Sequence, residues 1–339
     1  MRKMILLGIA AVAVAMTAGA AVAQTLSAVQ DRGALRCGVS TGLSGFSAPD
    51  ANGVWQGFDV ALCRAVAAAV LGDPMAVEFL PLNVQTRFAA LARGDVDILA
   101  RSTTWSFTHD VDLGLSFVGV SYYDGQGLMV RRDLGVAAAS ELDGARICIQ
   151  VGSTTEPNLA DYFRGNGMRY EPILVETIAE AQQQYLASAC DVYTADSSGL
   201  AATRASFADP DGHVILPEVI AKEPLGPVVR HGDDRWKDLV RWTFFALVAA
   251  EELGVTSANI AELAQGTGTP EINRLLGTEG EMGLMLGLDA EWAVRAISAA
   301  GNYGEIFAAT IGEGTPIGLA RGLNAQWGQG GLLYAPPFR

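Results

Sequence analysis

Short apolar runs alternate with amphipathic segments through the first third of the chain. An apolar run at 35–40 precedes a loop rich in Gly and Ser, and Asp59 is then placed to cap a helix whose apolar face holds Leu62 and Val66. The predicted elements that follow are a strand at 76–82, a helix at 85–93 that ends at Gly94, and a strand at 96–100. This order favours a largely parallel sheet covered by helices on both faces.

A second set of the same kind begins near residue 145. Its first strand, at 145–150, is followed by the run Ser153-Thr154-Thr155-Glu156-Pro157, which is typical of a helix start because hydroxyls cap the helix and proline needs no N–H there. The remaining predicted elements are a helix at 158–164, a strand at 170–175, a helix at 178–188 and a strand at 190–195. Two such lobes place a ligand cleft between them, at the carboxyl ends of strands.

The rest of the chain is predicted to return to the first lobe and then to become helical. Prolines at 217, 224 and 227 indicate extended chain over 216–230. Helices are predicted at 234–253, 259–265 and 289–300, and we expect them to pack on the first lobe.

The first 23 residues have the pattern of a secretory signal peptide. Arg2 and Lys3 precede an uncharged apolar stretch at 4–23 that closes with Ala21-Val22-Ala23. The alternative is a retained membrane anchor, which the small residues at the end disfavour. We expect cleavage after Ala23 and a mature protein that is soluble outside the cytoplasm, which in a Gram-negative host is the periplasm.

Composition narrows the class of protein. The chain has 339 residues, 50% of them hydrophobic and 18% charged, so it can bury enough apolar surface to fold. With 4 Cys it is not a small disulfide-built domain. A net charge of −14 makes a nucleic-acid partner unexpected, because phosphate binding relies on clustered Lys and Arg.

An oxidising compartment suggests that the four cysteines form disulfides. None has the C-x-x-C spacing of a zinc or thioredoxin-type site. Of the three possible connectivities we favour Cys37–Cys63 and Cys148–Cys190, because each pair falls inside one predicted lobe. Four buried free thiols are the alternative.

The sequence shows no sign of catalysis or of a resident metal or cofactor. His109, His213 and His231 are the only histidines and have no metal-binding spacing. The chain also lacks G-x-S-x-G and a phosphate-binding loop ending in Lys. We therefore expect a binding protein with no catalytic residues, no metal and no cofactor.

Polar side chains instead gather where the predicted strands end. Hydroxyls follow the third strand, at Ser102 to Thr104, and open a helix of the second lobe, at Ser153 to Thr155, while Asp196 follows the strand at 190–195. Hydroxyls and helix N-terminal amides suit a carboxylate, and a buried Asp suits an ammonium. Both needs coincide in a zwitterionic amino acid.

Several segments also carry a family likeness that covers nearly all of the mature chain. They are Cys37-Gly38-Val39, Gly57-Phe58-Asp59-Val60, Gly94-Asp95-Val96-Asp97, Thr103-Thr104-Trp105, Tyr122 to Gly127, Lys222 to Asp234, Ala249 to Asn259, Gly301 to Glu305 and Tyr334-Ala335-Pro336-Pro337. With them the chain resembles the periplasmic solute-binding component of a polar amino-acid ABC transporter, in the general L-amino-acid binding subgroup. The run from Lys222 to Asp234 and the C-terminal segment are the subgroup's specific marks.

The resemblance implies an α/β fold of the bilobal periplasmic binding protein type, with two doubly wound sheets joined by two crossover strands and a C-terminal helical extension. After the signal peptide at 1–23, we expect lobe 1 at 24–126 and lobe 2 at 127–218. Residues 219–339 return to lobe 1 and form the extension. The implied partners are an amino acid and an inner-membrane ABC permease, and the protein is expected to be a monomer.

The resemblance also implies a set of ligand contacts. In similar proteins an aromatic side chain of the first loop covers the ligand, hydroxyls and an arginine hold its carboxylate, and an acid of the second lobe holds its ammonium. By position these are Phe46 for the aromatic side chain, Ser102, Thr104 and Thr154 for the hydroxyls, Asp196 for the acid, and Arg87 for a further contact with the ligand's side chain or carboxylate.

One position departs from the family pattern, because His109 stands where relatives usually have the carboxylate-binding arginine. Histidine offers at most two donors and is largely neutral near pH 7, so the change should cost about tenfold to a hundredfold in affinity. Arg101 is a possible substitute, but in a regular strand it points to the face opposite Ser102. Either amino-acid binding tightens as pH falls through the pKa of His109, or the ligand is a carboxylate other than an α-amino acid.

Two further functions stay open at this point. A dehydratase-like periplasmic enzyme on the same scaffold would need an acid or base in the cleft, and Glu156 is the candidate. A sensory input domain that reports to a membrane partner is the other.

Overall fold

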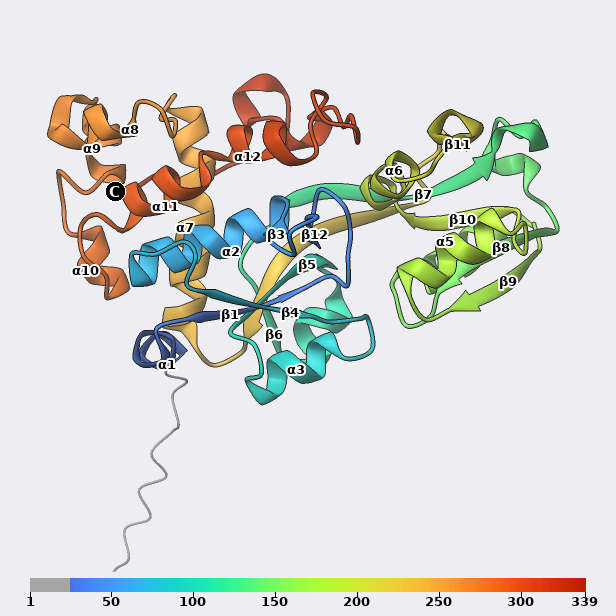
Figure 1. Cartoon of the computed structure of the whole chain (residues 1–339), viewed down its shortest axis with the longest axis horizontal. Coiled ribbons are helices and arrows are strands. Elements are labelled where there is room, and N and C mark those ends of the chain that lie inside the picture. The colour runs from blue at the N-terminus through green and yellow to red at the C-terminus, as the bar shows by residue number, and fades with distance from the viewer. Residues whose placement is uncertain (1–24) are drawn as a thin grey trace, which may run out of the picture.

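The structure is a computed structural model that describes residues 25–339, so the predicted signal peptide lies outside the described range (Figure 1). Within residues 25–339, no helix combines the length and the hydropathy that crossing a bilayer requires. Two α/β lobes are connected by two long antiparallel strands, β7 (Tyr122–Arg131) and β12 (Ala221–Arg230), which run side by side between them (Figure 1). The predicted bilobal α/β fold is confirmed.

Hydrogen bonding between the two connecting strands joins the two predicted sheets into one. The strand order is β4-β1-β5-β12-β7-β10-β8-β9, with β6 added at β12 and β11 added at β7. The sheet is mixed, because β12 is antiparallel to β5 and β10 is antiparallel to β7. Since one sheet passes through both lobes, the lobe boundaries at 126/127 and 218/219 stay predictions.

Lobe 1 has a parallel half-sheet in which β1 lies between β4 and β5. Its strands are β1 (Leu35–Val39), β4 (Val77–Pro81), β5 (Ile98–Thr104), β6 (Leu115–Phe117) and the short pair β2 (Ala48–Pro49) and β3 (Trp55–Gln56). Its helices are α1 (Thr25–Arg32), α2 (Phe58–Leu71) and α3 (Arg87–Arg93). Strand β5 continues four residues beyond the predicted end at 100, which carries Ser102 and Thr104 to the cleft.

Lobe 2 repeats the pattern, with β8 parallel to both β9 and β10. Its strands are β8 (Ala145–Gln150), β9 (Tyr170–Val175), β10 (Val192–Asp196) and β11 (His213–Ile215), and its helices are α4 (Thr155–Gly165), α5 (Ile178–Leu186) and α6 (Ser197–Ala205). The bounds of β8 and β9 are those predicted from the apolar runs. Thr154 occupies the N-cap position of α4, but its side chain makes no capping hydrogen bond, which corrects its predicted role as a cap.

The start of α2 differs from its prediction. The N-cap is Gly57, at φ 125°, where a Cβ atom would lie 2.3 Å from the carbonyl oxygen of Phe46. Asp59 therefore sits inside the first turn rather than at the cap. Its buried carboxylate accepts a hydrogen bond from Oγ of Ser102 (3.3 Å), and burial raises its pKa to about 7.

The C-terminal region forms the predicted helical extension on lobe 1 (orange to red in Figure 1). Its helices are α7 (Asp234–Glu252), α8 (Ile260–Glu262), α9 (Pro270–Leu275), α10 (Met282–Leu286), α11 (Trp292–Ala300) and α12 (Tyr303–Thr310). Trp236 and Trp292, 1% and 2% exposed, belong to the same apolar cluster as α2. Burying such rings contributes a few kcal/mol each, which fixes the extension to the lobe.

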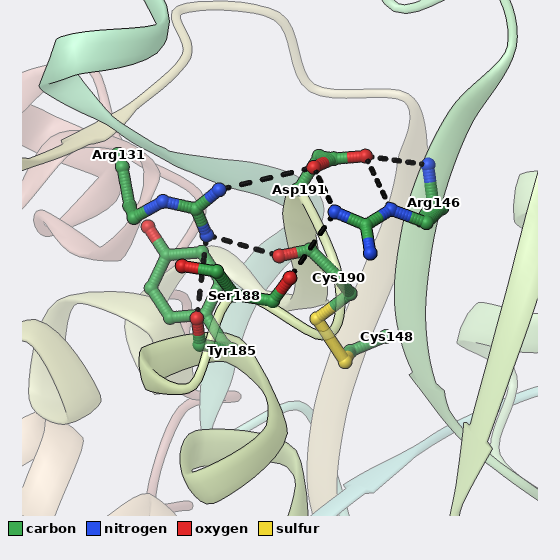
Figure 2. Close-up of a disulfide and its surroundings, with 7 residues drawn as sticks. All are labelled: Arg131, Arg146, Cys148, Tyr185, Ser188, Cys190 and Asp191. Atoms are coloured by element: carbon green, nitrogen blue, oxygen red, sulfur yellow. Dashed lines mark hydrogen bonds and ion pairs between the residues drawn. A yellow bond between two sulfur atoms is a disulfide. The ribbon is translucent and has the colours of Figure 1, made fainter.

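The cysteines pair inside the lobes, Cys37 with Cys63 and Cys148 with Cys190, at S–S distances of 2.03 and 2.08 Å. The second pair ties β8 to the segment just before β10 (Figure 2). Beside it, Asp191 accepts hydrogen bonds from the backbone and the guanidinium of Arg146 and lies 3.8 Å from Arg131. These links fix the strand that ends at Asp196.

Candidate functional site

A cleft of about 710 Å³, part of it open to solvent, lies between the two lobes. Lobe 1 contributes the carboxyl end of β5 and the start of α3, and lobe 2 contributes the start of α4 and the carboxyl end of β10. The expectation that strand ends form the cleft therefore holds. The predicted contacts that line it are Arg87, Ser102, Thr104, Thr154 and Asp196.

Two arginines bring positive charge into this cleft. Arg87 and Arg101 are 5% and 7% exposed, and the Nε atom of each is buried without a hydrogen-bond partner among residues 25–339. Burial lowers the pKa of Arg87 well below its usual value, while Asp196 and Glu223 act in the opposite direction, and burial lowers the pKa of Arg101 to about 10, so Arg101 is charged at neutral pH. Since guanidinium matches a carboxylate in shape and charge, the pair is suited to bind an anion.

The position of Arg101 corrects the sequence prediction. In a regular strand Arg101 and Ser102 would face opposite sides of the sheet, yet both line the cleft. The reason is the backbone of Ser102, which has a φ of 50° in the left-handed region and interrupts the alternation of side chains along β5. Such strain in a non-glycine residue persists only where its surroundings hold it, here with the hydrogen bond to Asp59.

Asp196 brings negative charge from the other lobe. It occupies the N-cap position of α6, but its side chain makes no capping hydrogen bond. Burial raises its pKa well above the usual value, the carboxyl groups of Asp124 and Glu223 raise it further, and the two cleft arginines act in the opposite direction. A carboxylate held in this way favours a cationic ligand group such as an ammonium.

The hydroxyls of Thr104 and Thr154 meet across the cleft, with their Oγ1 atoms 3.3 Å apart. Both donate hydrogen bonds to one carboxylate that the sequence analysis did not single out, that of Glu223 on β12. Asn158 Nδ2 donates to the same carboxylate at 2.8 Å. The only signal for Glu223 in the sequence was its place in the subgroup-specific run from Lys222 to Asp234.

The sequence analysis also missed Asp124, which lies opposite Glu223 on β7. Its carboxylate accepts hydrogen bonds from the backbone and hydroxyl of Ser198, and burial raises its pKa to about 6. The connecting strands therefore carry two neighbouring acids, the buried Glu223 and the half-buried Asp124.

Phe46 is not at the cleft, which corrects its predicted role as a cover for the ligand. Its ring is 1% exposed and packs edge-on against Phe58 and Tyr122 in the core of lobe 1, at centroid distances of 6.2 and 5.8 Å. Leu43 from the same loop lines the cleft in its place.

His109 does not line the cleft either. It lies in a π-helical turn at Thr108–Asp112, where its Nδ1 donates to the carbonyl oxygen of Thr104 (2.8 Å) and its ring packs against Phe88. Burial lowers its pKa, so the ring is neutral at pH 7. The positive charge that relatives were expected to place at this position comes instead from Arg87 and Arg101.

The pH dependence of binding should follow Asp196 and not His109. As pH falls through the raised pKa of Asp196, its carboxylate gains a proton and loses the attraction for an ammonium, so affinity for an amino acid should fall as the pH is lowered. His109→Ala should show the same profile. Calorimetric titration at a series of pH values checks this, and binding that tightens in acid only when His109 is present would contradict it.

The acid proposed for a dehydratase lies outside the cleft lining. Glu156 accepts a hydrogen bond from the backbone N–H of Gly152 at 3.2 Å.

Across residues 25–339, no group of three or more His, Cys, Asp or Glu side chains is arranged to hold a metal ion.

Two lobes, two connecting strands and a small charged cleft between them define a solute-binding protein that holds its ligand between its lobes. Residues 35–258 match the family model of bacterial extracellular solute-binding proteins, family 3, and the chain belongs to this family.

Three similar proteins have a name or a bound ligand that indicates what each of them binds. The chain is 62% identical to the glutamate/glutamine/aspartate/asparagine-binding protein BztA of Rhodobacter capsulatus, over 100% of both chains. It is 52% identical to the general L-amino acid-binding periplasmic protein AapJ of Rhizobium johnstonii, over 99% of both. A periplasmic binding protein from Brucella ovis with glutathione bound has 53% identity and a TM-score of 0.91, covering 93% of this chain and 99% of that one.

Proposed function

We propose that this protein captures acidic amino acids and their amides outside the cytoplasm and delivers them to an ABC permease. The observation that carries the proposal is the charge of the cleft. Its charged lining side chains among residues 25–339 are Arg87, Arg101 and Asp196.

These three groups match the charges of a dicarboxylic amino acid. Asp196 pairs with the α-ammonium, and the two guanidinium groups pair with two carboxylates, or with one carboxylate and one side-chain amide oxygen. A basic side chain would leave a guanidinium unpaired beside a like charge, which disfavours lysine and arginine. The proposed preference agrees with the ligands in the name of the Rhodobacter relative.

Calorimetric titration of refolded, ligand-free protein tests the proposal. We expect glutamate and aspartate to bind most tightly, glutamine and asparagine next, and lysine least. Glutathione belongs in the panel because it is bound in the Brucella structure and its γ-glutamyl end carries a free ammonium and α-carboxylate. If every amino acid fails to bind while another carboxylate does, the ligand class is wrong.

The remaining parts of the proposal concern the setting. Membership of an extracellular family supports secretion by the segment at 1–23, with cleavage after Ala23 and a periplasmic location in a Gram-negative host. We propose a monomer that docks on an inner-membrane permease. The binding-protein names of the relatives and the position of Glu156 outside the cleft lining disfavour the dehydratase.

A further inference from the structure

Glu223 lies on β12, one of the two strands that connect the lobes, opposite Asp124 on β7. Its side chain is 0% exposed, and it is not among the residues that line the cleft. Its carboxylate is instead engaged by other side chains of the protein.

Its carboxylate is bound from both lobes at once. Thr104, at the end of β5 in lobe 1, donates from its hydroxyl to Oε2. From the start of α4 in lobe 2, Thr154 donates to the same oxygen at 3.1 Å and Asn158 donates to Oε1 at 2.8 Å. An ionised carboxylate only accepts hydrogen bonds, so Glu223 is the acceptor in all three contacts.

We propose that Glu223 is a positioning residue that holds the two lobes in their closed arrangement around the ligand. The proposal rests on the proposed function and adds to it the group that sets the balance between open and closed forms. Rotation of one lobe away from the other separates β5 from α4, and Glu223 must then give up its partners on one side. Charge-assisted hydrogen bonds that exist only in the closed form favour that form.

The same hydrogen bonds change the role in ligand binding that we infer for Thr104 and Thr154. A hydroxyl has one proton, and those of Thr104 and Thr154 are used on Glu223. Toward the cleft their oxygen atoms present lone pairs, which accept from an ammonium and not from a carboxylate. The ligand carboxylates are then left to Arg87 and Arg101, in agreement with the unpartnered Nε atoms of these residues.

Burial raises the pKa of Glu223, and the charged groups around it act in opposite directions on its ionisation. Asp124 and Asp196 lie near it and disfavour a second negative charge, whereas Arg87 compensates. Loss of the Glu223 charge therefore relieves repulsion while it weakens the link between lobes, so a loss of closure cannot be ascribed to a new buried charge.

Glu223→Gln tests the proposal because it keeps the volume and removes the charge. We expect affinity to fall about tenfold, by the same factor for glutamate, aspartate and glutamine, since an apparent dissociation constant scales inversely with the closed fraction. Small-angle X-ray scattering should show a larger radius of gyration for the ligand-free variant than for the wild type. Asn158→Ala removes one lobe-2 donor without touching the cleft and should weaken all ligands severalfold.

The double variant and a neighbouring control complete the test. If both residues act through one tie, Glu223→Gln with Asn158→Ala should lose no more affinity than Glu223→Gln alone. Lys222→Gln, which changes an exposed charge on the same strand, should bind as the wild type does. A loss that differs among ligands, strictly additive losses, or an unchanged radius of gyration would overturn the proposal. Wild-type protein that binds no amino acid would overturn the proposed function, while the scattering comparison would still test Glu223.

Discussion

Asp196→Asn is expected to weaken amino-acid binding by about a hundredfold to a thousandfold without destabilising the ligand-free protein. The substitution keeps the shape of the side chain and removes the only negative charge that the cleft lining of residues 25–339 offers to an ammonium. Truncating one partner of a buried charge pair typically costs about 2–5 kcal/mol, and the expected loss of about 3–4 kcal/mol lies inside that range. Isothermal titration calorimetry with glutamate measures it.

The effect on stability should have the opposite sign. Because the pKa of Asp196 is raised in the folded protein, the folded state binds its proton more readily than the unfolded state, and ionisation opposes folding as pH rises from 3.8 toward the raised pKa. Asparagine removes this penalty. Urea denaturation of ligand-free protein at pH 7 should give a free energy of unfolding equal to or above that of the wild type.

Asp191→Asn is the matched control, since this aspartate precedes the same strand but pairs with Arg146 outside the cleft (Figure 2). Its hydrogen bond with Arg146 lowers its pKa, so its ionised form stabilises the fold, and that stability is lost as pH falls through the lowered pKa. At pH 7 the variant should be less stable and bind normally. Normal binding of glutamate by Asp196→Asn would contradict the assignment of Asp196 as the group that binds the ammonium.

Arg101→Met is expected to lower affinity for all amino acids by about a hundredfold, the second largest effect. Arg101 is 7% exposed and its buried Nε has no hydrogen-bond partner among residues 25–339, although Asp59 and Asp196 lie close enough to favour its charge, so an arriving anion adds a hydrogen-bond partner for it. Methionine preserves the apolar stem and removes both the charge and the fork-shaped donor set. The loss should appear in the calorimetric dissociation constant of every ligand that carries an α-carboxylate.

Arg101→Lys separates charge from geometry. Lysine keeps the positive charge but cannot donate two parallel hydrogen bonds to a carboxylate, so about a tenfold loss is expected. Equal affinities for the lysine and methionine variants would mean that the fork alone matters. Wild-type affinity for the methionine variant would show that Arg101 does not hold the ligand.

Much of the framework was predictable because its signals are local. Apolar runs of strand length gave β8 and β9 their observed bounds, and alternation with amphipathic segments indicated two α/β lobes. The general rule for strand ends then brought Ser102, Thr104, Thr154 and Asp196 to one cleft. Arg87 also reached the cleft as the resemblance implied.

The wrong predictions concern side chains whose position depends on one backbone angle or on one contact with residues distant in the sequence. Arg101 faces the cleft because Ser102 adopts a φ of 50°, which no strand pattern indicates. Phe46 was expected at the ligand, but its ring fits between Phe58 and Tyr122 in the core. His109 turns to the carbonyl of Thr104, and its place in the sequence did not reveal that orientation.

The sequence by itself determined the two-lobed α/β organisation and most of the polar groups at the cleft, because periodicity and strand ends depend on neighbours along the chain. Only the tertiary structure decided which charges meet there. Glu223 joins groups 119, 69 and 65 residues away, and contacts at such separations follow from how the lobes pack. The assignment of the arginines to an anion and of Asp196 to a cation depends on the same packing, since burial and proximity set those electrostatics.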